Sequence, residues 1–267
     1  MNMFWHELKS LRKSTVIWTC VLIAIAALYL SLYPGMVQDA EDFKKLLAGY
    51  PPAVRAMLGI RLDSITSILG YYSFAFAFIA LCGAIQGMNL GVSILSKESR
   101  ERTADFLLVK PVSRAGVVTA KLLAALTTLL ATDVVFYAAI WPLANAVKTS
   151  GFSGRLFFMV NLTLLFLQFI FLALGLGISV FFQKLKSVLP LSLGVVFGFY
   201  IAGALIAAGP NAGAARYLSP FRYFDTAYIL RHAAYEVSYL VTGAAVVAVT
   251  IVVTYLIYVK KDIHAVG

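Results

Sequence analysis

The run LFFMVNLTLLFLQFIFLALGLGISVFF, residues 156–182, contains no charged residue. A helix needs about 20 mostly apolar residues to cross the roughly 30 Å hydrocarbon core of a bilayer, so this run is long enough to span one. Five similar runs surround it, and the only acidic residue inside any of the six is Asp133. We place the six runs at about 14–33, 70–95, 117–144, 156–182, 187–209 and 237–259. The sequence therefore predicts an all-α polytopic membrane protein with six transmembrane helices.

The overall composition indicates a membrane domain. Hydrophobic residues make up 61% of the 267 residues and the mean hydropathy is +0.87, whereas soluble domains average roughly 45–50% apolar residues. We therefore expect a single transmembrane domain over residues 1–267, in contact with membrane lipids. The two cysteines, Cys20 and Cys82, lie in apolar runs and indicate neither a disulfide framework nor a metal site.

The charge distribution predicts the orientation. Thirteen Lys and Arg residues fall on the side that holds both termini, and nine fall on the other side. The side richer in Lys and Arg is normally cytoplasmic, so both termini are expected to be cytoplasmic. The net charge of +10 fits this inside-positive pattern and contact with anionic lipids. No nucleic-acid-binding motif accompanies the charge, so no nucleic acid partner is expected.

Three segments outside the spans have recognisable patterns. Residues 1–13 place apolar side chains on one helical face, which predicts a short amphipathic helix lying in the membrane interface. A short helix is expected at about 39–49, within the outer segment 34–69. The aromatic segment 216–236 suits the outer headgroup layer. It either lies at the interface or re-enters the membrane before span six.

Asp133 is the most unusual polar residue inside a span. It lies about 16 Å along the apolar part of span three, near the bilayer midplane. An acid at this depth is costly and therefore suggests a function. Candidate partners along a translocation path are Gln86, Asn89, Asn161 and Gln168, and a bound cation or proton is another possibility. The alternative is a structural aspartate that joins two helices.

Glycines at every fourth position mark two helix faces. Gly83, Gly87 and Gly91 lie in span two, and Gly194 and Gly198 lie in span five. Small residues at this spacing let helices approach closely. These faces pack either within one subunit or at a dimer interface, and span five is the better candidate for the interface.

The segment SKESRERTADFLLVKPVSRAGVVTAK, residues 96–121, puts nine charges between two apolar runs. Its first part can be helical, Pro111 should end that helix, and Ser113 can cap the next one. The apolar cluster 106–109 would have no reason to stand in a solvated loop. A protein-docking surface explains both the charges and the cluster, while a solvated inside-positive loop is the simpler alternative.

Two patterns resemble enzyme sites. GFSG at 151–154 matches a serine motif of rhomboid proteases, which need a histidine base within the membrane, but His6, His232 and His264 lie outside the spans. His232 and Glu236 are four residues apart, yet two residues do not make a metal site. No catalytic residue is expected. The chain also lacks a G-x-x-x-x-G-K-[ST] loop, so any use of ATP needs a partner.

The charged segment carries the order E-x-x-x-x-T-x-x-x-L-L-x-x-P-V-S-R, followed seven residues later by Lys. This order resembles the cytoplasmic loop of type-2 permease subunits of ABC exporters. It is formed here by Glu98, Thr103, Leu107, Leu108, Pro111, Val112, Ser113, Arg114 and Lys121. The six spans, the amphipathic N-terminus and LSPFRYFD at 218–225 fit the same family, so the resemblance covers nearly the whole chain. One departure is Arg102, where the family usually has Gly.

The resemblance implies a permease subunit of the bacterial plasma membrane that pairs with itself or with a similar subunit. Two cytoplasmic ATPase subunits would dock beneath it and hold ATP and magnesium, while this chain needs no cofactor. Segment 98–110, within the cytoplasmic segment 96–116, would be the coupling helix, and 1–13 the elbow helix. The residues expected to contact the ATPase are Glu98, Arg100, Glu101, Arg102, Thr103, Phe106, Leu107, Leu108, Pro111 and Arg114.

The implied activity is export by alternating access. The nearly uncharged spans favour a hydrophobic or amphipathic substrate, such as a drug, antibiotic, peptide or lipid. Two other functions remain open: a secondary transporter or channel with Asp133 as its ion or proton site, and an intramembrane enzyme. Transport driven by an ion gradient without an ATPase would support the first of these. Loss of activity in Ser153→Ala would support the second.

Overall fold

The computed structural model describes residues 2–51, 54–55, 60–101, 113–181, 187–209 and 213–260, and no β-strand occurs in these ranges. The elements are α1 (Asn2–Gln38), α2 (Ala40–Ala48), α4 (Ile68–Glu101), α6 (Arg114–Val147), α7 (Gly154–Phe181), α8 (Leu189–Ala208), η1 (Ala214–Leu218), η2 (Pro220–Arg222), α9 (Thr226–His232) and α10 (Val237–Lys260). The short elements η1 and η2 are 3₁₀ helices.

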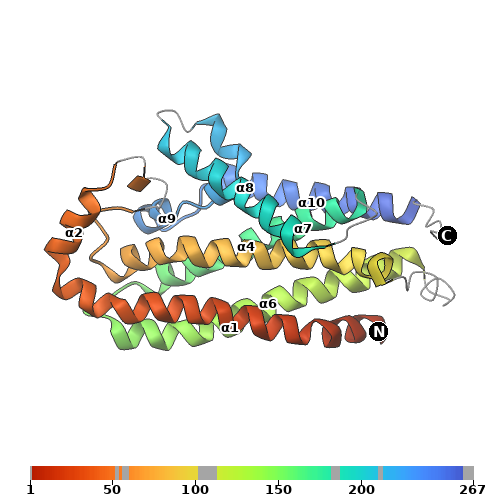
Figure 1. Ribbon diagram of the computed structural model, residues 1–267, viewed down its shortest axis with the longest axis horizontal. Coiled ribbons are helices and arrows are strands. Elements are labelled where there is room, and N and C mark those ends of the chain that lie inside the picture. The colour runs from red at the N-terminus through yellow and green to blue at the C-terminus, as the bar shows by residue number, and fades with distance from the viewer. Residues whose placement is uncertain are drawn as a thin grey trace.

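Six of these helices are long and apolar enough to cross a membrane: α1, α4, α6, α7, α8 and α10. Each overlaps one predicted span, so the expected all-α fold with six spans is confirmed. The long helices run side by side, with both termini at one end of the bundle and α2 and α9 at the other (Figure 1). The short helix expected at 39–49 corresponds to α2.

The amphipathic N-terminal segment and the first span form one helix, which differs from the prediction. Residues 1–13 were expected to form a separate elbow helix, but α1 continues unbroken from Asn2 to Gln38. The physical reason is that no Gly or Pro occurs before Pro34, so the backbone has no helix breaker where its polarity changes. A separate interfacial elbow is therefore not confirmed.

The start of α6 agrees with the predicted cap. Ser113 has an extended backbone, and its hydroxyl accepts a hydrogen bond from the Gly116 N–H at 3.1 Å. Such a bond satisfies one of the free N–H groups at a helix start. The preceding helix α4 continues to Glu101. The coupling helix expected at 98–110 lies mostly outside the described residues.

The closest packing in the bundle is between α4 and α7, followed by α1 with α6 and α10 with α7. Glycines allow the α4–α7 approach. A Cβ atom at Gly91 would overlap the Leu172 carbonyl oxygen, and one at Gly87 would lie 2.5 Å from the Gln168 carbonyl oxygen. By contrast, a Cβ atom at Gly194 or Gly198 would meet no atom within 4 Å. The α4 glycine face thus packs inside the subunit, while the α8 face is uncovered by the described residues.

Candidate functional site

A chain of hydrogen bonds crosses the bundle within the spans. Thr19 on α1 donates to the Thr132 hydroxyl at 3.3 Å, and Gln86 Nε2 on α4 donates to the same hydroxyl at 3.1 Å. Gln168 Nε2 on α7 donates to Gln86 Oε1 at 3.1 Å. All four side chains are buried. Because hydrocarbon offers no alternative partners, such bonds hold helices together, and these join α1, α6, α4 and α7.

Asp133 follows Thr132 on α6 but does not take part in this series of hydrogen bonds. Both of its carboxylate oxygens are buried, and neither has a hydrogen-bond partner among the described residues. A buried carboxylate without a partner is costly in a membrane. Asp133 therefore remains the strongest intramembrane candidate for binding a cation or proton.

The four polar residues predicted beside this acid lie on α4 and α7. Gln86 and Gln168 are bonded to each other. Asn161 accepts a hydrogen bond from the Tyr72 hydroxyl at 2.7 Å, also between α4 and α7. Asn89 is half-buried. The contacts seen for Gln86, Gln168 and Asn161 join helices, and a role for the four residues in a translocation path stays a prediction.

Buried charges join α1 to α4 and α6 at the end that holds the termini. Lys121 on α6 is fully buried, its Nζ lies 3.7 Å from Glu7 Oε1, and it donates to the Ile94 carbonyl of α4. Glu7 is only 5% exposed. Nearby, Lys97 Nζ donates to the Ser10 hydroxyl at 2.8 Å. These contacts fix α1 to the two helices that flank the predicted coupling segment.

The Glu7–Lys121 pair was not predicted from the sequence. Glu7 is the only acidic residue before Asp39, and Lys121 stands within the apolar run of span three. The available signals are a single acid in the amphipathic N-terminal stretch and a single base in an apolar run. Pairing them requires knowing that α1 packs along α6, and spacing within a single helix does not contain that information.

Most residues expected to contact the ATPase lie outside the described residues. These are Arg102, Thr103, Phe106, Leu107, Leu108 and Pro111. Glu98, Arg100 and Glu101 belong to the last turns of α4, where only the backbone is described. Arg114 is half-buried at the first position of α6. The coupling role of all these residues stays a prediction.

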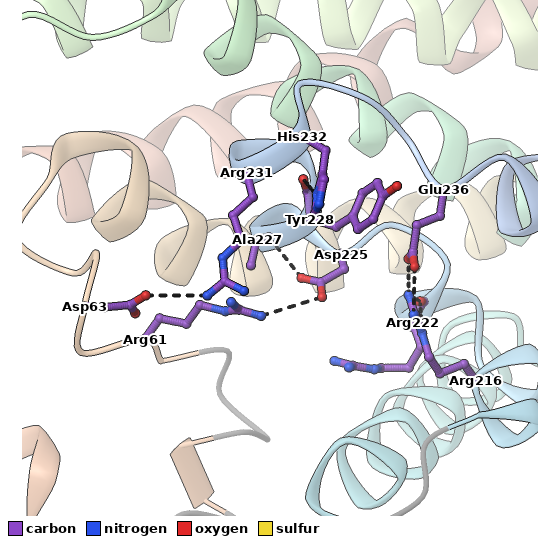
Figure 2. A network of polar contacts seen from close by, with 10 residues as sticks. All are labelled: Arg61, Asp63, Arg216, Arg222, Asp225, Ala227, Tyr228, Arg231, His232 and Glu236. Carbon is purple, nitrogen blue, oxygen red and sulfur yellow. Dashed lines mark hydrogen bonds and ion pairs between the residues drawn. The ribbon is translucent and has the colours of Figure 1, made fainter.

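Ion pairs connect the loop before α4 to α9 at the opposite end of the bundle (Figure 2). Arg61 Nη2 lies 3.8 Å from Asp225 Oδ2, and Arg231 Nη2 lies 3.5 Å from Asp63 Oδ2. Asp225 also caps α9, because its Oδ1 accepts a hydrogen bond from the Ala227 N–H at 2.9 Å. The loop before α4 and helix α9, which are far apart in the sequence, are thus held together.

Arg216 and Glu236 form a two-pronged pair that connects η1 to the start of α10. Arg216 Nη1 donates to Glu236 Oε1 at 3.1 Å, and Nη2 donates to Oε2. Nη2 also donates to the Arg222 carbonyl at 3.0 Å, and the guanidinium lies 4.1 Å from the centre of the Tyr239 ring. Burial alone would lower the pKa of Arg216, but the bond to Glu236 outweighs it and the pKa is raised.

The two enzyme-like patterns do not assemble as sites. Ser153 is exposed. The His232 ring stacks on Tyr228, while Glu236 is held by Arg216 (Figure 2). Among the residues that the structure describes, no group of three or more His, Cys, Asp and Glu side chains could hold a metal ion.

The fold and the contacts between its helices define a multi-pass membrane protein. A family model described as ABC-2 family transporter protein matches residues 1–263. Because the match covers nearly the whole chain, the chain belongs to the ABC-2 family and is a membrane permease of an ABC transporter. No curated protein gives a significant match to the chain.

Proposed function

We propose that this permease belongs to an ATP-driven exporter and works with a separate cytoplasmic ATPase, which holds ATP and magnesium. The family match over residues 1–263 is the observation that carries this proposal. Hydrolysis on the partner would move a hydrophobic or amphipathic substrate outward by alternating access. The charge distribution supports placing both termini in the cytoplasm, and the family match supports a bacterial plasma membrane as the location.

The ATPase would dock at the end of the bundle that holds the termini. Support comes from the arrangement of α4 and α6, whose neighbouring ends flank segment 102–112 at this end (Figure 1). A push on this segment would reach both helices directly. It would also reach α1, because Lys121 joins α6 to Glu7 and to the Ile94 carbonyl of α4. Three spans would then move as one body.

A second permease subunit, identical or similar, would complete the transporter. The face of α8 that carries Gly194 and Gly198 supports this placement, because no described atom lies within 4 Å of a Cβ atom built there. Close helix contacts in membranes favour such small residues.

Charge reversal in the coupling segment tests the proposal. We expect Glu98→Lys combined with Glu101→Lys to lower the stimulation of a co-expressed ATPase by about tenfold, as a loss of roughly 1.4 kcal/mol in docking would. The ATPase would be chosen from genes adjacent to this one, and activity would be measured in proteoliposomes. Yield and monodispersity of the variant should match those of the unmodified permease.

Glu41→Lys combined with Asp42→Lys supplies the matched control, because both residues are exposed on α2, at the opposite end of the bundle (Figure 1). It makes the same charge change away from the proposed docking site and should leave stimulation within about twofold. Equal losses in both variants, or no loss in either, would argue against ATPase docking at segment 96–116.

A secondary transporter is the second candidate, favoured by the unpartnered carboxylate of Asp133. If the exporter proposal is right, Asp133→Asn should keep ATPase stimulation within about twofold, because asparagine has nearly the same shape. Vesicles that contain the permease alone should show no proton uptake, measured with trapped pyranine under a proton gradient. Proton uptake that requires the permease and disappears in Asp133→Asn would support the secondary transporter instead.

A further inference from the structure

A cavity of about 610 Å³ is lined in part by α9 and the loop before α4, and α9 lies at the end of the bundle opposite the termini (Figure 1). The cavity wall is built from α4, α7, α8 and α9, together with the loop before α4 and the segment between α8 and α9. Ligand pockets usually measure about 300–1,000 Å³. The cavity is therefore large enough to hold a small molecule or the head and part of the tail of a lipid-like one.

The charged groups around this cavity leave a surplus of positive charge. Four arginines and two aspartates line it: Arg55, Arg61, Arg222, Arg231, Asp63 and Asp225. Both aspartates are already paired, Asp225 with Arg61 and Asp63 with Arg231. The guanidinium groups of Arg55 and Arg222 make no ion pair with any described residue, and the Nε atom of each is buried without a hydrogen-bond partner.

Arg222 is held in a position where an anion would complete its contacts. Figure 2 shows its side chain pointing away from Glu236, which is occupied by Arg216. Gly203 on α8 makes room for this arrangement, because a Cβ atom there would lie 2.8 Å from Ser219 Oγ and 3.4 Å from Arg222 Cγ. Burial lowers the pKa of Arg222, which means that its charge is held at a free-energy cost that a bound anion would offset.

The part of the cavity that enters the spans is mainly apolar. Phe76 and Ala80 on α4 and Leu167 on α7 line it, and Ala80 lies about 18 Å along α4 from its first residue. Of the polar side chains at this depth, Ser73 and Thr163 already donate hydrogen bonds to carbonyls of their own helices, and Tyr200 on α8 adds one hydroxyl to an otherwise apolar wall. An apolar chain would therefore fit this part better than a hydrated group.

We propose that this cavity binds an anionic amphiphile, with its phosphate or carboxylate beside Arg55 and Arg222 and its apolar tail between α4, α7 and α8. Arginine forms charge-assisted, two-pronged bonds with both kinds of anion. A cationic molecule would meet the surplus positive charge, and a small hydrophilic anion would leave the apolar part unfilled. The inference deepens the proposed function, on which it rests, by naming the substrate class that the exporter releases.

Binding to the full-length permease in neutral maltoside micelles, without an ATPase, tests the site by calorimetry. The probe is dioctanoyl phosphatidic acid, compared with dioctanoyl phosphatidylcholine and with inorganic phosphate. We expect the phosphatidic acid to bind at least about tenfold more tightly than either comparison compound. Arg222→Gln should weaken its binding by about tenfold, the effect of losing one charge-assisted contact.

Two further variants make the result specific. Arg155→Gln removes an exposed arginine near the start of α7, outside the cavity, and should change binding less than about twofold. Ala80→Phe fills the apolar part without changing any charge and should weaken phosphatidic acid binding by about tenfold. All variants must elute as monodisperse permease, so that a loss of binding is separated from misfolding.

Several outcomes would overturn the inference. Equal binding of phosphatidylcholine would mean that only apolar chains are recognised, and equal binding of phosphate would mean an anion site without a tail pocket. Equal losses in Arg155→Gln and Arg222→Gln would indicate general surface charge. Binding as expected with no ATPase stimulation would refute the exporter but keep the site, whereas stimulation without binding would refute only the anionic amphiphile.

Discussion

Gly91→Ala should destabilise the helix bundle, whereas Gly194→Ala should leave its stability unchanged or slightly higher. A Cβ atom at Gly91 on α4 would overlap the Leu172 carbonyl oxygen and lie 3.0 Å from Gly175 Cα on α7. Backbone atoms cannot move aside as a flexible side chain can, so the two helices must separate. Overpacking of this kind costs about 1–3 kcal/mol. The measurement is the thermal unfolding midpoint of purified permease, followed by intrinsic fluorescence.

Gly194→Ala is the control that separates the effect of helix packing on stability from the effect of helix propensity. Alanine favours a helix over glycine by about 1 kcal/mol, and this gain applies to both positions. At Gly194 nothing within 4 Å opposes it, so only Gly91→Ala should have a lower unfolding midpoint. Equal midpoints in the two variants would show that α4 and α7 are not packed at backbone contact. A lower midpoint for Gly194→Ala that recovers at higher protein concentration would indicate that α8 pairs with a second copy.

The six spans could be predicted because each requires only a long, mostly apolar run. Their ends were harder to place. Helix α1 begins at Asn2, well before the apolar run at 14–33, because a change in polarity does not stop a helix. The end of a helix depends on local caps and breakers, which is why Ser113 marked the start of α6 correctly.

The hydrogen bonds between the spans depend on the rotation of each helix about its own axis, which the sequence did not reveal. Asp133 was singled out by its charge, but its neighbour Thr132 receives the hydrogen bond from Gln86. Adjacent residues on a helix point about 100° apart, so the rotation of α6 decides which of them faces α4. Apolar residues surround both positions in the sequence, and no clear polar face indicated that rotation.

The arginine-lined cavity was also missed by the sequence patterns. The segment 216–236 was noted for its aromatic residues, and Arg61 was counted only for orientation. The cavity forms because the loop before α4 meets the segment between α8 and α9, more than 150 residues later in the chain. A contact between segments so far apart in the sequence produces no periodicity or residue spacing from which it could be predicted.

Lys121→Met should cause the largest loss of stability of any substitution considered. Lys121 is fully buried, pairs with Glu7 at 3.7 Å and donates to the Ile94 carbonyl. Methionine fills a similar volume but leaves the Glu7 carboxylate buried without this partner. Removing one member of a buried pair costs about 3–5 kcal/mol. We expect a large fall in the thermal unfolding midpoint. We also expect a loss of ATPase stimulation, to the extent that stimulation requires α1 to move together with α4 and α6.

The double variant Glu7→Gln with Lys121→Met separates the pair from simple packing. Replacing both charges removes the uncompensated carboxylate, so the double variant should be more stable than Lys121→Met alone. Lys97→Met is the matched control, because the bond from Lys97 to Ser10 is exposed, and it should change stability by only about 0.5 kcal/mol. Strictly additive single effects would refute the coupling of Glu7 to Lys121. If the double variant regains stability but not ATPase stimulation, the charges are needed for transmission beyond holding α1 in place, because a purely structural pair would restore both.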